Sequence, residues 1–192
     1  FGDAIMFYEL EVQGHIRVDP VFFAEDTKEA LKKSLVGTFD GFISKDLGVV
    51  IGVKEVTEVK EGVIVPGDGA AYYDTTFKVI TYRPEVLEMS LGKITDITDF
   101  GAFINIGPMD GMIHVSQTMD DFVSFSKSNV LAGKESGRTL KVGDLCRARI
   151  VSVSFKDISN PKIGMTMRQH RLGNLKWIDD DLAKEKKKKT GN

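Results

Sequence analysis

The 192-residue sequence has little cysteine, no long apolar run and almost no net charge, and each shortage excludes a class of protein. Its one cysteine, Cys146, cannot form a disulfide within the chain, so the sequence does not require an oxidising compartment. No apolar run approaches the roughly 20 residues that span a bilayer. The N-terminus also lacks the charged start and apolar stretch of a secretion signal. The sequence therefore predicts a cytoplasmic protein without a membrane anchor.

Groups of residues that could hold a metal ion or carry out catalysis are also missing. His15, His114 and His170 are scattered without metal-ligand spacing, and a single cysteine cannot complete a zinc site. The adjacent carboxylates at residues 120–121 and 179–181 point apart on a helix, so we interpret them as solvated clusters. We therefore expect no catalytic residue, no metal and no cofactor, and a nuclease or other hydrolase is not supported.

The net charge of −2 argues against a strongly basic nucleic-acid binder, but the charge is unevenly distributed. Residues 1–80 carry 8 Lys or Arg against 14 Asp or Glu, whereas residues 81–192 carry 18 against 14. Five of those lysines lie in the tail at residues 184–189. Any affinity for RNA must then come from local placement and stacking rather than from a bulk positive field.

The first half is expected to be rich in strands, with one helix. Residues 6–13 alternate apolar and polar side chains, which is typical of a half-buried strand. A helix is predicted to begin near Asp26 and Thr27 and to end at Gly37. Its predicted apolar stripe consists of Ala30, Leu31, Leu35 and Val36. Further strands are expected at residues 49–53 and 75–82, separated by a turn-rich loop at 63–70, and Arg83-Pro84 is the predicted domain boundary.

The second half predicts a barrel of short strands followed by a helix. Five strands in Greek-key spacing over about 80 residues are typical of an OB barrel. Residues 117–140 are long for a plain loop, so we expect some helix within them. A last helix is predicted from Asn174 onward, with Leu175, Ile178 and Leu182 on one face. The five predicted strands are residues 91–97, 102–106, 111–115, 146–153 and 163–167.

A group of aromatic and basic residues in the second half predicts an RNA-binding surface. Phe100 and Phe103 flank a turn into a strand, and exposed aromatic faces stack on unpaired bases. His114 can stack or donate to a phosphate, while Arg147 and Arg149 are expected to share one strand face. The alternative is that one phenylalanine belongs to the core and that the arginines are merely solvated. With Lys162, the candidate RNA-binding residues are Phe100, Phe103, His114, Arg147, Arg149 and Lys162.

The same stretch resembles the S1 RNA-binding domain, which is a variety of the OB-fold. The resemblance rests on Phe-Gly-Ala-Phe at residues 100–103, Gly-Met-Ile-His-Val-Ser at 111–116 and Gly-Asp at 143–144. It departs from the S1 pattern where Ser154 replaces a common aspartate and where Lys162 occupies the place of an RNA-facing arginine. Lysine lacks the planar fork of arginine, so base selectivity there is in doubt.

The whole chain from about residue 6 to 186 resembles the E-type large stalk subunits of archaeal DNA-directed RNA polymerase, counterparts of the seventh subunit of eukaryotic polymerase II. Residues 66–72, 119–123, 133–137 and 175–178 carry this resemblance beyond the general S1 pattern. It implies a truncated RNP-like α/β domain followed by an S1-type OB-fold barrel, in a non-catalytic stalk subunit of the polymerase. It also implies a smaller RNA polymerase stalk subunit of the F type as partner, a polymerase core and contact with the emerging single-stranded RNA.

The resemblance implies a division of roles along the chain. Residues 1–83 would form the RNP-like domain that docks on the polymerase core, and residues 84–172 the RNA-binding barrel. Residues 173–192 would form a helix and basic tail, whereas residues 1–5 are either native or an added remnant before Met6. A free-standing S1 protein of translation or RNA decay is the alternative function. The candidate docking residues, for which plain turn chemistry is the alternative, are Asp19, Pro20, Gly67, Asp68 and Gly69.

Overall fold

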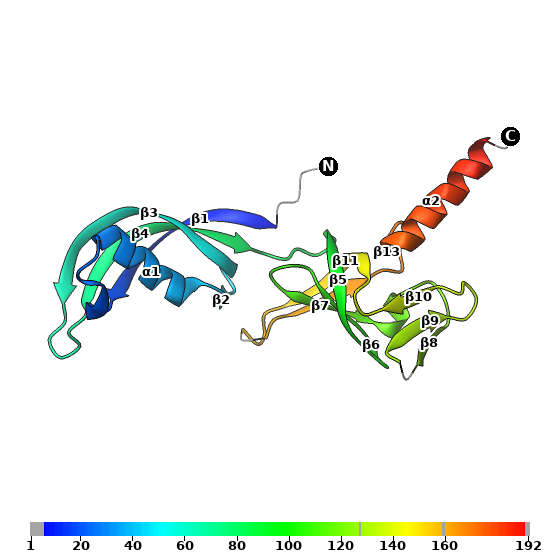
Figure 1. The fold of residues 1–192 in the computed structure, drawn as a ribbon, viewed down its shortest axis with the longest axis horizontal. Helices are drawn as coiled ribbons and strands as arrows, with labels where there is room; N and C mark the ends of the chain where they lie inside the picture. The colour runs from blue at the N-terminus through cyan, green and yellow to red at the C-terminus, as the bar shows by residue number, and fades with distance from the viewer. Residues whose placement is uncertain (1–5, 127, 159, 191–192) are drawn as a thin grey trace. The chain divides into compact units, whose positions relative to one another are not determined.

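The computed structural model describes residues 6–126, 128–158 and 160–190, so the prediction about residues 1–5 lies outside the described residues. The chain divides into two compact units, Phe1–Arg83 and Pro84–Asn192 (Figure 1). Neither described helix is long and apolar enough to cross a membrane. Each unit has its own sheet and helix, so each is described by itself.

The first unit is a four-stranded antiparallel sheet with one helix packed against it. Its strands lie in the order β1-β4-β3-β2, and Figure 1 shows β3 and β4 arching over helix α1. Strand β3 has 17 residues, more than the 12 of β4, and four register shifts between the two strands absorb the difference. Such bulges bend and twist a strand, which explains the curvature. The elements are β1 (Phe7–Val18), η1 (Pro20–Phe22), α1 (Thr27–Phe39), β2 (Ile43–Ser44), β3 (Gly48–Ile64) and β4 (Ala71–Tyr82).

The core of this unit lies between α1 and one face of the sheet. Leu31 and Leu35 of the helix are fully buried against strand residues such as Phe77. Each buried leucine side chain contributes about 1.5–3 kcal/mol to folding. The opposite face carries ion pairs across strands, including Lys54 Nζ to Glu9 Oε2 at 2.6 Å. One face of the sheet is therefore apolar and the other solvated.

Helix α1 starts where the sequence predicts but ends later. The side chain of Asp26 accepts a hydrogen bond from the Lys28 amide at 3.1 Å, so the N-cap prediction is confirmed. Gly37 does not end the helix, which continues to Phe39, and the left-handed residue is instead Gly41 with φ 73°. Val36 is exposed rather than part of the buried stripe. The helix continues because Phe39 still packs on the core, whereas Val36 is rotated by about 100° from the buried Leu35 and so leaves the apolar stripe.

The second unit is a closed five-stranded barrel, as predicted. Neighbours follow the order β7-β6-β5-β11, and β12 closes the barrel by pairing with both β7 and β11. The β12–β7 pairing is parallel and the other barrel pairings are antiparallel. Inward side chains such as Ile94, Ile104 and Ile150 are fully buried. The strands are β5 (Met89–Thr98), β6 (Gly101–Asn105), β7 (Asp110–His114), β11 (Leu145–Ser154) and β12 (Lys162–Thr166).

The prediction of helix within residues 117–140 is wrong. After the short η2 turn (Val115–Gln117), this segment forms a second sheet of three antiparallel strands. The strands are β8 (Val123–Ser126), β9 (Val130–Gly133) and β10 (Thr139–Lys141). Leu131 and Leu140, which pair across β9 and β10, are both fully buried.

The last described element is helix α2 (Leu175–Thr190), which follows the two-residue strand β13 (Gly173–Asn174). The Asn174 side chain accepts a hydrogen bond from the Lys176 amide at 3.0 Å, which caps the helix close to its predicted start. Ile178 is buried as predicted, together with Trp177, whereas Leu175 and Leu182 are half-buried. The guanidinium of Arg138 lies over the Trp177 ring at 5.6 Å. The first turn of α2 is thereby fixed to the barrel unit.

Candidate nucleic-acid interface

Two phenylalanines and one histidine meet on the outer surface of the barrel. Gly101 on β6 pairs with His114 on β7, which brings the histidine beside the Phe100 turn. The rings of Phe100 and Phe103 pack edge to face, with centroids 6.1 Å apart. Phe100 is 47% exposed and Phe103 is half-buried. We call Phe100, Phe103 and His114 the aromatic cluster.

Gly101 permits this close arrangement. A Cβ at position 101 would lie 2.1 Å from the carbonyl oxygen of Ile113, a rigid backbone atom of the neighbouring strand. Any other residue would force β6 and β7 apart and separate Phe100 from His114. The Phe-Gly pair in the sequence therefore has a steric reason at this point of the barrel.

The imidazole of His114 is fixed through Nδ1, and no described residue forms a hydrogen bond with its Nε2. Its Nδ1 accepts a hydrogen bond from the Ser116 amide at 3.2 Å and lies 2.8 Å from Ser116 Oγ. A neutral ring that accepts at Nδ1 carries its proton on Nε2. His114 is an exposed residue, so Nε2 can donate to a phosphate oxygen or a base edge, and the ring face can stack on a base.

The predicted basic residues are spread more widely than the aromatic cluster. Arg149 pairs with Thr166 on β12, which places it two strands from His114, and its Nη1 donates to Gln169 Oε1 at 2.6 Å. The Nε of Arg149 is buried without a partner among the described residues. Arg147 pairs with Leu91 and Gly173, farther from the aromatic cluster.

Lys162 lies toward the other end of the barrel wall. The register pairs Ile163 with Gly111, so Lys162 sits beside the start of β7, whereas His114 ends that strand. Four residues of strand separate these positions by about 13 Å. The structure thus brings together Phe100, Phe103 and His114 and leaves Arg147 and Lys162 apart, and the RNA-binding roles of all six residues stay predictions.

Sequence reasoning missed a pocket beside the aromatic cluster, with a volume of about 580 Å³. We call it the Phe122 pocket, because Phe122 is 74% exposed on its wall. Residues 119–123 stand out in the sequence as a family-like segment, but nothing in them signals a pocket. Its other walls include Val115, Ser116, Asp120, Glu135 and Arg168.

Asp121 holds one wall of the Phe122 pocket. Its carboxylate accepts hydrogen bonds from the amides of Glu135 and Ser136 and from Ser136 Oγ, the last at 2.6 Å. The Ser136 hydrogen bonds favour the ionised form and lower the pKa of Asp121 to about 2. At neutral pH this carboxylate is therefore charged and fixes the loop after β9.

Two loops at one end of the first sheet are joined by a guanidinium. Arg17 donates from Nε and Nη2 to both carboxylate oxygens of Asp68, at 3.0 and 2.9 Å, and from Nη1 to Asp19 at 3.3 Å. The Tyr72 hydroxyl also donates to Asp68, at 2.7 Å. Hydrogen bonding by Arg17 and then Tyr72 lowers the pKa of Asp68 to about 2, while these carboxylates raise the pKa of Arg17. The predicted docking residues Asp19 and Asp68 therefore meet at one tip.

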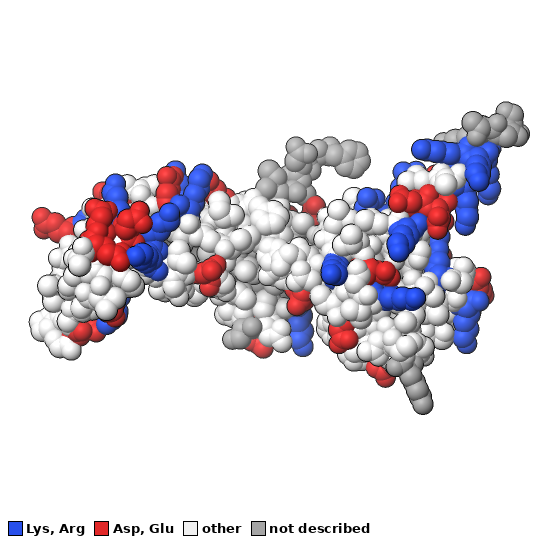
Figure 2. All heavy atoms as spheres, in the orientation of Figure 1, with Lys and Arg blue, Asp and Glu red and all other residues white. Residues whose placement is uncertain are grey.

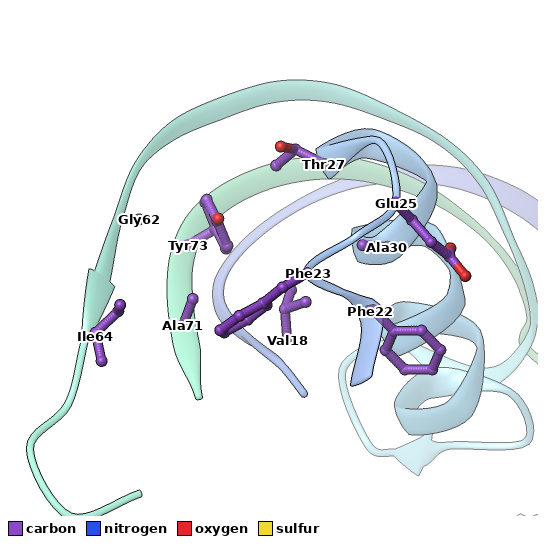
Figure 3. Close-up of a pocket in the computed structure, with 10 residues that line it drawn as sticks. All are labelled: Val18, Phe22, Phe23, Glu25, Thr27, Ala30, Gly62, Ile64, Ala71 and Tyr73. Carbon is purple, nitrogen blue, oxygen red and sulfur yellow. The ribbon is translucent and has the colours of Figure 1, made fainter. Parts of the chain in front are cut away.

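Apolar side chains surround this tip. Val21 is 76% exposed, and Val63 and Ile64 are exposed at the end of β3. A hollow of about 220 Å³ lies between η1 and the sheet, and Figure 3 shows Phe23 near its centre and Ile64 at one edge. Exposed apolar patches of this kind are typical of protein contact sites. We call residues 19–23 and 63–70 the tip.

A second apolar surface lies on the barrel, where Leu145 of β11 and Leu91 of β5 are diagonal neighbours. Leu145 pairs with Lys93, two residues from Leu91, and the leucines are 57% and 59% exposed. Met89 and Leu87 extend this exposed row along and before β5. We call Leu87, Met89, Leu91 and Leu145 the leucine surface.

Basic side chains gather along α2, as Figure 2 shows. Lys184 and Lys186 to Lys188 lie on this helix.

Comparisons with known proteins cover both units. Residues 13–69 match the SHS2 domain found in the N terminus of Rpb7p/Rpc25p/MJ0397, and residues 83–157 match the S1 RNA binding domain. The apo form of Mycoplasma genitalium RNase R covers 42% of this chain and 13% of its own at 28% identity, with a TM-score of only 0.36.

Two relatives extend over most of the chain. DNA-directed RNA polymerase III subunit RPC8 of Bos taurus is 22% identical over 80% of this chain and 79% of its own. DNA-directed RNA polymerase subunit Rpo7 of Sulfolobus acidocaldarius is 34% identical over 95% of this chain and 100% of its own. The chain therefore belongs to the Rpo7 family of DNA-directed RNA polymerase subunits, with an SHS2 domain followed by an S1 RNA-binding domain.

Proposed function

We propose that this chain is the larger, non-catalytic stalk subunit of an archaeal-type RNA polymerase, which binds single-stranded nascent RNA and pairs with a smaller stalk subunit of the F type. The main support for this proposal is the similarity to Rpo7, which spans both units rather than the S1 domain alone. A free-standing S1 protein is not favoured, because residues 13–69 also match a polymerase-subunit domain. The proposal includes a cytoplasmic location, since archaeal cells transcribe there.

The two exposed apolar surfaces support the protein contacts in this proposal. The tip carries the exposed side chains Val21, Val63 and Ile64, and the Arg17–Asp68 ion pair joins its two loops. An apolar surface on joined loops is suited to docking on the polymerase core. The leucine surface is a separate candidate for the smaller subunit, because exposed leucines on adjacent strands leave apolar area unburied. Association would bury these side chains and stabilise the complex in proportion to the area removed from water.

Co-expression with the candidate small subunit of the same genome tests the pairing. Size-exclusion chromatography with light scattering should give a 1:1 complex, and a pull-down from native extract should recover core polymerase subunits. Two independent monomers and no recovered core would overturn the proposal and leave only the S1 domain's RNA binding.

The aromatic cluster is the proposed RNA surface. Phe100→Ala should weaken binding of single-stranded RNA, because base stacking on an aromatic ring contributes about 1–3 kcal/mol per base. Fluorescence anisotropy with labelled oligoribonucleotides measures this loss. The variant should still form the 1:1 complex with the small subunit, and unchanged RNA affinity would move the RNA site elsewhere on the chain.

A further inference from the structure

We propose that the Phe122 pocket binds one unpaired RNA base that carries an exocyclic amino group. The proposal rests on the RNA-binding function proposed above and extends its surface beyond Phe100, Phe103 and His114. It assigns a role to the most exposed aromatic ring of the barrel unit, that of Phe122.

The pocket has the size of a small-molecule site and an exposed aromatic ring whose backbone is held in place. Its volume of about 580 Å³ lies within the range of small-molecule sites. The carbonyl of Phe122 accepts a hydrogen bond from the Lys134 amide at 2.9 Å, and the preceding Asp121 is fixed to Ser136. The ring therefore projects from a backbone that is held on both sides, so binding need not order this segment.

Two hydrogen bonds join the pocket wall to residues of the aromatic cluster, none of which lines the pocket itself. The amide of Val115, a residue of the pocket wall, donates to the Phe100 carbonyl at 2.8 Å. Ser116, on the same wall, donates its amide to His114 Nδ1 at 3.2 Å. Neighbouring nucleotides of one strand can thus occupy the aromatic cluster and the pocket together.

The polar groups of the pocket favour an amino-bearing base. The Glu135 side chain is exposed on the pocket wall, and the described residues offer its carboxylate no hydrogen-bond partner. A carboxylate accepts hydrogen bonds from the N4 amino group of cytosine, whereas uracil presents an acceptor at that position. Arg168 on the same wall is paired with Asp120 through Nε and Nη2, both at 2.9 Å, so it balances that carboxylate and leaves the Glu135 carboxylate as the acceptor for the base.

Anisotropy titrations with the full chain test the site, with eight-nucleotide rC8 and rU8 as probes. Phe122→Ala should weaken rC8 binding about five-fold or more, and Phe122→Trp should restore it. Phe125→Ala is the matched control, because Phe125 is an exposed ring on β8 that does not line the pocket. Glu135→Gln should reduce the preference for rC8 over rU8, because an amide no longer presents two acceptors.

The outcomes separate this proposal from the function on which it rests. Wild-type affinity in Phe122→Ala, together with weakened binding in Phe100→Ala, would overturn the pocket and keep the RNA-binding surface. Wild-type RNA affinity in both Phe122→Ala and Phe100→Ala would overturn the pocket and the proposed RNA-binding surface. If Phe122→Ala kept its RNA affinity but lost the small subunit in size-exclusion chromatography, the pocket would be a protein contact and the proposal would be wrong.

Discussion

Arg17 and Asp68 lie 51 residues apart in the sequence and meet through two parallel hydrogen bonds of 3.0 and 2.9 Å. Bidentate arginine–carboxylate pairs are among the stronger hydrogen-bonded contacts in proteins. This pair joins the end of β1 to the loop between β3 and β4, and Asp19 is drawn into the same contact at 3.3 Å. The two halves of the tip are therefore held together as one surface.

The Arg17–Asp68 contact predicts a pH dependence at the acidic end. Hydrogen bonds from Arg17 and Tyr72 lower the folded-state pKa of Asp68 to about 2, below its unfolded value of about 3.9. The contact therefore stabilises the fold fully above about pH 4 and loses this contribution as the pH falls toward 2. An NMR titration of the Asp68 carboxyl carbon should show the low midpoint, and Arg17→Lys should move it upward. A midpoint near 4 in the wild type would contradict the geometry.

Gly133 predicts a sharp steric effect in the small sheet of the barrel unit. A Cβ at this position would lie 2.2 Å from Asp121 Oδ2 and 2.7 Å from Ser136 Oγ, inside the hydrogen bonds that hold the loop. We expect Gly133→Ala to lower the free energy of unfolding of this unit by about 1–3 kcal/mol, as measured by urea denaturation. Gly52→Ala, whose Cβ meets nothing within 4 Å, is the control. Equal stability of Gly133→Ala and the wild type would mean that Asp121 does not hold this loop.

The sequence predicted those parts of the fold that depend on local patterns. Alternation over residues 6–13 and the Asp26 cap correctly located β1 and α1, and the Phe-Gly-Ala-Phe stretch correctly indicated the barrel. The β8–β10 sheet was missed because the expectation of helix rested only on the length of residues 117–140, although β8 and β9 pair as a local hairpin through Ser126 and Val130. The Phe122 pocket was missed because its walls come from segments that are distant in the sequence, such as Val115 and Arg168.

Because α1 continues past Gly37, replacing this glycine with alanine should stabilise the first unit. Gly37 lies inside α1 with open space around its Cα, and its φ is not in the left-handed region. Glycine in a helix interior costs about 0.5–1 kcal/mol relative to alanine. Gly37→Ala should therefore raise the melting temperature of the first unit, as followed by circular dichroism. Gly41→Ala should lower it, because Gly41 has a φ of 73° that an alanine adopts only with strain. A loss of stability in Gly37→Ala would mean that the helix ends before residue 37.

The leucine surface predicts which substitutions separate the chain from its proposed small partner. Leu91 and Leu145 are exposed by more than half, so aspartate at both positions should leave the barrel folded. A charge buried without a partner is costly, and the double variant Leu91→Asp/Leu145→Asp should therefore weaken the 1:1 complex at least ten-fold in isothermal titration calorimetry. Ile158→Asp changes a similarly exposed residue outside the leucine surface and should bind normally. The double variant should also keep the RNA affinity of the wild type, because the aromatic cluster is on other strands. Normal complex formation by the double variant would exclude the leucine surface as the contact with the small subunit.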